Sequence, residues 1–287
     1  MKKILVPTDF STCADNALQF AIESARLLPA EITILHAMDL PGTLYADNVG
    51  VNREFRQTMW HEDENKLEAL KYKVERESGL TIGTRLVAGT LMDAVEFVLK
   101  ADNFDLVIMG TLGAGGLGEK LWGSNTADVI GVSTIPVLAI PKDYRWKKPE
   151  KFLLATGNFE KAPAILDKVF ELAGLYMAHV DVAIFTGEHG DAIEFMEHSR
   201  PAAWYREMLS RHYGEQDVHT AQLYGKKLEK SLQEYIDKEN VDVLVMISYK
   251  RGFWERLLHP SQTKRISYHT RVPLLAVPAE GHAGDGV

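Results

Sequence analysis

The sequence predicts an α/β protein built from two tandem copies of one domain, each a parallel sheet with helices on both faces. Short runs rich in Val, Ile and Leu alternate with longer segments of helical periodicity, which is typical of buried parallel strands. The same order of runs occurs twice along 287 residues. Residues 105–141 and 242–278, aligned without gaps, are identical at 10 of 37 positions. Chance would give roughly two or three, which indicates an internal duplication.

The first elements follow from apolar spacing. Residues 4–6 are an apolar run that a proline ends, so we expect a short buried strand. Residues 14–28 carry apolar side chains three and four positions apart, which predicts a helix. Residues 32–37 form the next strand. Residues 55–74 are mostly polar but keep an apolar stripe, which predicts a long surface helix.

The rest of the first half repeats this alternation. We expect a strand at 81–88, a helix at 91–99 and a continuous apolar strand at 106–109. A helix then starts at Ser124, and a strand at 137–140 closes the half before a proline. The second half offers strands in the same order, at residues 152–154, 178–185, 218–223, 243–247 and 274–277.

The two predicted domains span residues 1–143 and 150–287. Between them the charged, proline-containing stretch 142–151 suits a linker. Two domains of this size can each bury a core without disulfides or metal. Because the halves are copies, we expect an intrachain pseudo-dimer, with a homodimer as a further possibility.

Composition limits the functions open to the chain. A net charge of −8 argues against a general nucleic-acid binder, which needs a basic surface. Cys13 is the single cysteine, so no intrachain disulfide can form. An inert helix residue is the favoured interpretation of Cys13, ahead of a redox role. The apolar run after Lys2 and Lys3 is too short for a secretory signal and no stretch reaches membrane-spanning length, so we expect a cytoplasmic protein without membrane partners.

A glycine motif follows the strand at 106–109. Gly110, Gly113, Gly123 and Ser124 have the spacing G-x2-G-x9-G-S. Gly110 lies at a strand's carboxyl end, where α/β sheets bind ligands, and its missing Cβ allows close approach to a ribose or phosphate. Gly113 permits a sharp turn. Gly123 and Ser124 open a helix whose N-terminus favours an anion, and further donors there are Asn125 and Thr126.

An acidic residue ends the first strand. Pro7, Thr8 and Asp9 lie where parallel strands would bring them to the same rim as Gly110. Asp9 can accept hydrogen bonds from an adenine amine or from ribose hydroxyls. It can also cap the helix that begins near Ser11, and the two roles are compatible.

These features together resemble a tandem universal stress protein. The similarity includes the glycine motif, the opening Pro-Thr-Asp-Phe-Ser at residues 7–11, Leu-His-Ala at residues 35–37 and the Pro-Val-Leu-Ala-Ile-Pro ending at residues 136–141. The resemblance spans both halves. It implies a Rossmann-like fold with a five-stranded parallel sheet in each domain, ATP binding in members with this motif, and a stress-response or signalling role.

The resemblance also implies a site. Pro7, Thr8 and Asp9 would surround the adenosine, and the Ala37 backbone would read the adenine. The ribose and phosphates would lie against Met109, Gly110 and Gly113, and the triphosphate would be held by Gly123, Ser124, Asn125 and Thr126. The ATP would be accompanied by a divalent metal such as Mg²⁺, and the sequence itself shows no dedicated metal ligands.

The second half departs from the pattern. Ile247, Lys250 and Pro260 stand where the first half has its three glycines, and only Ser261 is kept. Thr-Gly-Asn at 156–158 replaces the acidic edge. Branched and bulky side chains would fill the space that phosphates need, so we expect no ATP there by the same mode.

A basic cluster gathers in this half instead. Its members are Lys250, Arg251, Arg256, Lys264 and Arg265, with Arg271 and two histidines nearby. It could contact an anion or a partner surface, although a solvated or interdomain face paired with carboxylates is the simpler interpretation.

Three functions remain open. The first is a regulatory adenine-nucleotide-binding protein. The second is a slow ATPase or autophosphorylating enzyme, although no general base beyond Asp9 and no arginine finger stands out, so no catalytic residues are assigned. The third is an interaction module that works without nucleotide, through the basic cluster.

Overall fold

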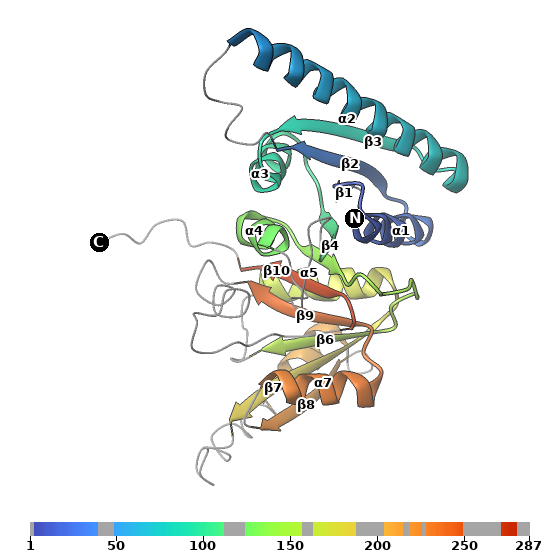
Figure 1. Ribbon diagram of the computed structural model, residues 1–287. Coiled ribbons are helices and arrows are strands. Elements are labelled where there is room, and N and C mark those ends of the chain that lie inside the picture. Colours follow the sequence, from blue (N-terminus) through green and yellow to red (C-terminus); the bar gives the residue numbers. More distant parts are fainter. Residues whose placement is uncertain are drawn as a thin grey trace. The chain divides into compact units, whose positions relative to one another are not determined.

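The computed structural model describes residues 3–39, 49–111, 124–156, 163–187, 204–214, 218–225, 228–248 and 271–279 (Figure 1). Its contacts divide the chain into two compact units, Met1–Lys142 and Asp143–Val287. Within each unit the strands pair in parallel, which confirms the predicted fold class.

The first unit is a five-stranded parallel sheet in the order β3-β2-β1-β4-β5. Its strands are β1 (Lys3–Thr8), β2 (Glu31–Met38), β3 (Ile82–Ala88), β4 (Leu106–Gly110) and β5 (Val137–Ile140). The central β1 pairs with β2, where Thr8 lies opposite His36, and with β4 on its other side. The carboxyl ends of β1, β2 and β4 therefore meet at one edge of the sheet, which we call the carboxyl edge.

Helices cover both faces of this sheet. They are α1 (Thr12–Leu27), α2 (Val49–Ser78), α3 (Leu91–Ala101) and α4 (Ser124–Val132). α1 and α2 lie on one face, and α3 and α4 lie together on the other (Figure 1). The hydroxyl of Ser11 caps α1 by accepting from the Ala14 amide at 3.2 Å, and Thr90 caps α3 in the same way.

α2 is longer than its apolar stripe predicted. It runs over Val49–Ser78 rather than 55–74, and Leu67 and Val74 are among its buried side chains. The added N-terminal residues carry no regular apolar face, so periodicity alone could not find them. The helix ends where Gly79 adopts a φ of 73°, a left-handed conformation that suits glycine at a helix C-terminus.

The second unit repeats the order of strands. Its sheet runs β10-β9-β6-β7-β8, again parallel. Its strands are β6 (Lys151–Thr156), β7 (His179–Gly187), β8 (Val218–Gly225), β9 (Val243–Ser248) and β10 (Leu274–Pro278), and its helices include α5 (Pro163–Leu175) and α7 (Leu228–Glu239). Residues 204–213 are also helical, a helix that was not predicted from the sequence. Thr156 lies opposite Ile184 as Thr8 lies opposite His36, so the registers of the two copies match.

The duplicated aspartate has a structural role at the opposite, amino end of each sheet. Asp105 donates its backbone N–H to Lys3 O at 2.9 Å, and its carboxylate accepts from Lys3 N at 2.9 Å. Asp242 repeats both bonds with Lys151, at 2.9 and 3.0 Å. In each copy the aspartate before the fourth strand holds the start of the central strand by hydrogen bonds. This structural role explains why both copies have aspartate at this position, and it requires no ligand.

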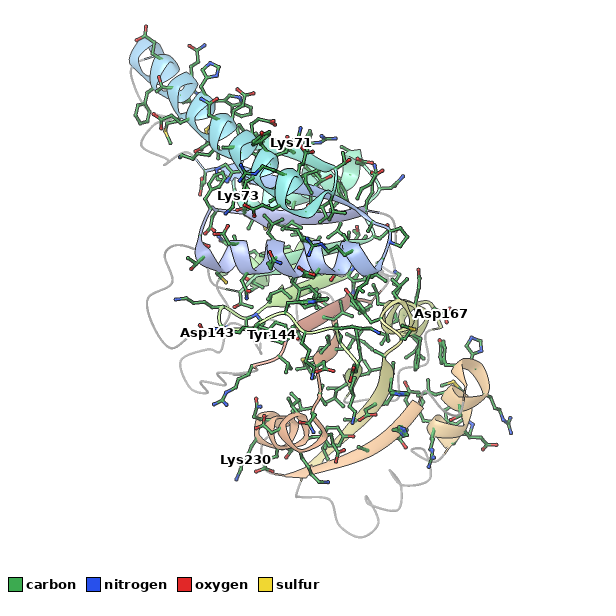
Figure 2. The ribbon with its side chains drawn as sticks, turned by 90° about the vertical axis from the view of Figure 1, so that its right-hand side faces the viewer. Lys71, Lys73, Asp143, Tyr144, Asp167 and Lys230 are labelled. Carbon is green, nitrogen blue, oxygen red and sulfur yellow. The ribbon has the colours of Figure 1, made fainter. Side chains whose placement is uncertain are left out.

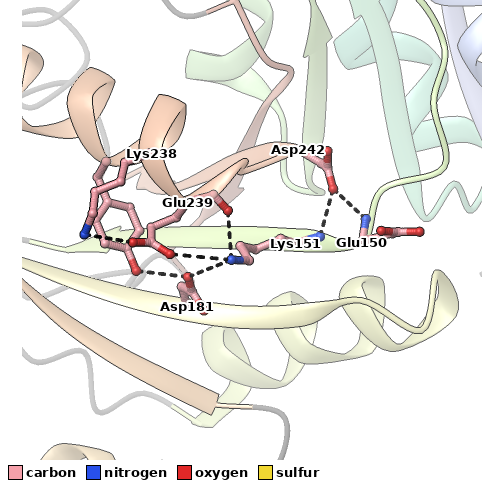
Figure 3. Close-up of polar contacts among 7 residues, drawn as sticks. Glu150, Lys151, Asp181, Lys238, Glu239 and Asp242 are labelled. Atoms are coloured by element: carbon pink, nitrogen blue, oxygen red, sulfur yellow. Dashed lines mark hydrogen bonds and ion pairs between the residues drawn. The ribbon is translucent and has the colours of Figure 1, made fainter.

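A polar network surrounds Lys151 in the second unit (Figure 3). The Tyr235 hydroxyl donates to the buried Asp181 carboxylate at 3.0 Å, while Lys151 Nζ donates to Glu239 O at 2.8 Å and lies 4.0 Å from Asp181. Burial, followed by the Asp181 charge and hydrogen bond, raises the pKa of Tyr235. The buried charge is thus met by hydrogen bonds, as stability requires.

The segment predicted as a linker is attached to the second unit. Asp242 accepts from the backbone N–H of Glu150 at 2.8 Å and pairs with the Lys147 ammonium. Tyr144, which precedes β6 (Figure 2), is half-buried. Burial and then the nearby charges of Asp242 and Tyr176 raise its pKa to about 12, so Tyr144 stays neutral at physiological pH.

Candidate functional site

Most of the predicted nucleotide-binding residues that the structure describes gather at the carboxyl edge of the first unit. They come from β1, the turn after it, β2, β4 and the start of α4. Four of these residues are buried: Pro7, Thr8, Met109 and Thr126. Two are partly exposed, Ala37 and Gly110, and two are exposed, Asp9 and Asn125. Ser124 is the first residue of α4.

Gly110 is held tightly against the start of α1. A Cβ added to it would lie 2.7 Å from both the carbonyl oxygen and Sγ of Cys13. A Cβ cannot lie this close to another atom, so an alanine here would force neighbouring atoms to shift. The backbone carbonyl of Cys13 cannot rotate away as a side chain can. The sequence suggested that this glycine lets a ligand approach, but the structure gives it a packing reason as well. It also gives buried Cys13 a place in the core.

Thr126 ties α4 to the end of β4. Its buried Oγ1 lies 3.2 Å from both Gly110 O and Thr111 O, so the hydroxyl donates to one carbonyl or is shared between them. Thr111 is also buried, and within the described residues its own hydroxyl has no hydrogen-bond partner. Because a buried unpaired hydroxyl is costly, this position is suited to a polar atom from outside the described residues.

Replacing Thr126 with valine tests this tie. Valine keeps the shape but removes the donor, so we expect the first unit to lose about 1 kcal/mol of unfolding free energy. Urea denaturation of the full chain measures the change. The control is Thr134→Val at an exposed threonine, which we expect to stay within about 0.5 kcal/mol of wild type. Equal losses in the two variants would contradict the tie.

Asp9 shapes the turn into α1. Its Oδ1 accepts from Ser11 N at 3.0 Å, while Ser11 itself caps the helix. Its charge also reaches Asp15: burial first, opposed by Lys73 and then aided by Asp9, raises the pKa of Asp15. Lys73 comes from the C-terminal part of α2 (Figure 2). Asp9 therefore supports the capping turn and remains exposed at the carboxyl edge.

Two residues at this edge were not assigned a role from the sequence. The His36 ring is buried, with Nδ1 2.8 Å from Thr8 O and Nε2 3.3 Å from Asp63 Oδ2. Phe10 packs against it with ring centroids 4.6 Å apart, from a backbone φ of 60° that is unusual for a non-glycine residue. In the sequence, His36 contributed only to the family resemblance. Its contact with Asp63 could not be found there, because Asp63 lies 27 residues further along the chain, on α2.

The second unit has a different carboxyl edge. Strand register places Ile247 where the first unit has Gly110, since Ile247 lies opposite Val277 as Gly110 lies opposite Ile140. Ile247 is 4% exposed. A branched side chain thus occupies the glycine position.

Some predicted site residues lie outside the described residues. These are Gly113 and Gly123 of the glycine motif, and the basic cluster of Lys250, Arg251, Arg256, Lys264 and Arg265. Within the described ranges, no group of three or more His, Cys, Asp or Glu side chains could hold a metal ion. No helix in the same ranges is both long and apolar enough to cross a bilayer.

The fold defines a class: tandem α/β domains, each with five parallel strands, whose carboxyl edges differ at the position of Gly110. Residues 1–141 and 149–278 each match the model of the universal stress protein family. The chain therefore belongs to the universal stress protein family and carries its domain twice.

The chain is also similar to individual proteins. Universal stress protein MJ0577 of Methanocaldococcus jannaschii is 30% identical over 155 residues, covering 49% of this chain and 95% of that protein. The crystal structure of a universal stress protein from Archaeoglobus fulgidus has a TM-score of 0.71 at 19% identity, covering 96% of each chain, a likeness of fold. Another universal stress protein, solved in complex with cAMP, is 22% identical with a TM-score of 0.37, covering 50% of this chain and 98% of that one.

Proposed function

We propose that the first unit is a regulatory adenine-nucleotide-binding domain that takes one ATP, and that the second unit takes none by the same mode. The observation that carries this proposal is the start of α4 at the carboxyl edge. A helix N-terminus presents unpaired backbone N–H groups and the positive end of the helix dipole, which favour phosphate. Thr126 keeps this helix start beside Gly110 and Thr111.

The nearby side chains suit the remaining parts of a nucleotide. Asp9 is exposed and ionisable, so it can accept from ribose hydroxyls or an adenine amine. Ala37, one residue beyond the pair Thr8 and His36, brings backbone groups to the same edge. Asn125 is exposed in the first turn of α4 and can donate to a phosphate oxygen.

A divalent metal would come with the nucleotide. Mg²⁺ is usually held by substrate phosphates and one or two carboxylates rather than by an all-protein cage. When bound, the metal would neutralise phosphate charge.

The proposal also includes the domain limits 1–143 and 150–287 and the intrachain pseudo-dimer.

Calorimetry with purified full-length protein tests the proposal. We titrate MgATP, ADP, AMP and cAMP and expect one adenine nucleotide per chain. Asn125→Ala removes one phosphate donor and should weaken MgATP binding about tenfold, the equivalent of one hydrogen bond. Asp128→Ala, also exposed on α4, is the matched control and should change affinity by no more than about threefold.

The outcome separates the three functions. Absence of heat, together with an unchanged melting temperature at millimolar nucleotide, would overturn the proposal and favour the interaction module. Turnover of labelled ATP that Asp9→Ala abolishes would support the enzyme alternative. If MgATP binds but labelled ATP is not turned over with time, the result supports a regulatory site.

A further inference from the structure

His36 lies between two acceptors. Its side chain is 11% exposed at the end of β2. On one side Nδ1 is 2.8 Å from the Thr8 carbonyl oxygen, which can only accept, so Nδ1 carries a proton. On the other side Nε2 is 3.3 Å from the Asp63 carboxylate. A neutral ring protonated at Nδ1 would present a lone pair to this carboxylate, so both contacts are satisfied together only by the imidazolium.

The alternative, a protonated Asp63 that donates to a neutral ring, is disfavoured. Burial opposes the Asp63 charge, but the hydrogen bond from Lys66 and then the His36 charge overcome it, so the pKa of Asp63 is lowered. Lys66 Nζ lies 2.9 Å from Asp63 Oδ1 and 5.9 Å from the centroid of the Phe10 ring. The Lys66 ammonium therefore already holds one Asp63 oxygen, which favours the ionised carboxylate and assigns the proton of the other contact to the His36 ring.

Other charges around the ring are already engaged. Asp63 is on α2, so the ring faces α2, and α3 covers the other face of β2 (Figure 1). Charged groups on the elements around the ring include Asp63, Lys66 and Glu62 on α2, Asp9 after β1, and Arg85 on β3. Glu62 acts on Lys66, Asp9 accepts from Ser11, and Arg85 donates to Thr84 O at 3.1 Å. Among the contacts of the described residues, Asp63 is the charge that touches the ring.

We propose that His36 is a pH-sensitive latch, which fastens α2 to the carboxyl edge of β1 and β2 when its ring is protonated and releases it when the proton leaves. The two ends of the latch are 27 residues apart in sequence. The latch is formed at low pH and lost as pH rises and the ring gives up its proton. It does not depend on nucleotide binding.

The duplication and the chain itself supply comparisons. Register places Ile184 of the second unit at the position of His36, so that copy has no titratable group there. On α2, His61 and Glu64 form a second histidine–carboxylate pair, at 3.4 Å, but their side chains are 72% and 55% exposed. Solvent weakens such a pair. Glu64→Gln is therefore a matched control for Asp63→Asn.

The test combines histidine NMR with hydrogen exchange on the full chain between pH 5.5 and 8.5. The ring-nitrogen signals of His36 are assigned with His36→Gln. We expect both ring nitrogens to be protonated at pH 6, and Asp63→Asn to lower the pH of deprotonation by about one, as loss of a contacting carboxylate does. Glu64→Gln should leave this pH unchanged.

Hydrogen exchange then reports on the helix. Exchange of the α2 amides around Asp63, corrected for the intrinsic rate, should rise about threefold from pH 6 to pH 8 in wild type and in Glu64→Gln, consistent with loss of one ion pair. It should be independent of pH in Asp63→Asn. A ring that is neutral at pH 6 in wild type would overturn the latch, as would an Asp63→Asn protein with the wild-type pH dependence.

Discussion

Asp242→Ala should lower the unfolding free energy of the second unit by about 2–4 kcal/mol. The carboxylate is buried and accepts from the backbone N–H groups of Glu150 and Lys151 at 2.8 and 3.0 Å, and it pairs with Lys147. Alanine removes the acceptor for two amides at the start of the central strand and leaves a cavity. Bonds to a charged acceptor are among the stronger hydrogen bonds in proteins.

The duplication provides the control for this prediction. Asp105→Ala removes the equivalent carboxylate of the first unit, which is exposed and accepts one backbone N–H, from Lys3. We expect a loss of about 1 kcal/mol or less there. Denaturant unfolding gives the free energies, and hydrogen exchange of β4 and β9 assigns them to a unit. Equal losses in the two variants would show that burial of Asp242 is not the cause.

The repeated residues thus divide by what they do. Asp105 and Asp242 are identical because both copies must fasten the start of the central strand at the amino end of the sheet. Gly110 and Ile247 differ at the carboxyl edge, where we propose that only the first copy binds a nucleotide, and the second copy keeps its parallel strands without this glycine. The residue that the two copies share and the residue at which they differ therefore lie at opposite ends of the fourth strand of each unit.

The sheets were largely predictable from sequence. The continuous apolar runs gave the strands and their parallel arrangement, because a strand covered on both faces needs apolar side chains at every position. The ends of α2 and the helix at 204–213 were missed. Both segments carry exposed polar side chains, for example Arg76 at the C-terminal end of α2 and Arg211 in the second helix. An irregular apolar pattern gives no periodicity to detect.

The candidate site was predictable only in part. Strand ends and a helix start can be located from sequence, so Asp9, Gly110 and Thr126 were found as candidates. The His36–Asp63 contact joins β2 to α2 and depends on helix rotation and packing, which no local pattern records. The packing of Gly110 on Cys13 was hidden for the same reason. Both are long-range contacts, and both affect residues that the motif had highlighted for another reason.

Gly110→Ala should destabilise the first unit by about 1–3 kcal/mol, the usual cost of overpacking a core. The new Cβ would lie 2.7 Å from the Cys13 carbonyl oxygen and from its Sγ. Relief needs movement of the α1 backbone. Cys13→Ala in the same chain removes the sulfur but not the carbonyl, so the double variant should recover less than half of the loss relative to Cys13→Ala alone.

Gly131→Ala is the control for the same substitution. Gly131 lies in α4, and a Cβ there would meet no atom within 4 Å. Alanine should stabilise that helix by about 0.5–1 kcal/mol, since glycine costs conformational entropy in a helix. Opposite signs for the two glycine variants in urea denaturation would establish the packing role of Gly110. A Gly110→Ala protein as stable as wild type would leave ligand approach as the remaining reason for this glycine. The packing role affects the unfolding free energy, and the role in ligand approach affects the affinity for MgATP. Calorimetry with MgATP on the folded Gly110→Ala variant therefore separates loss of binding from loss of stability.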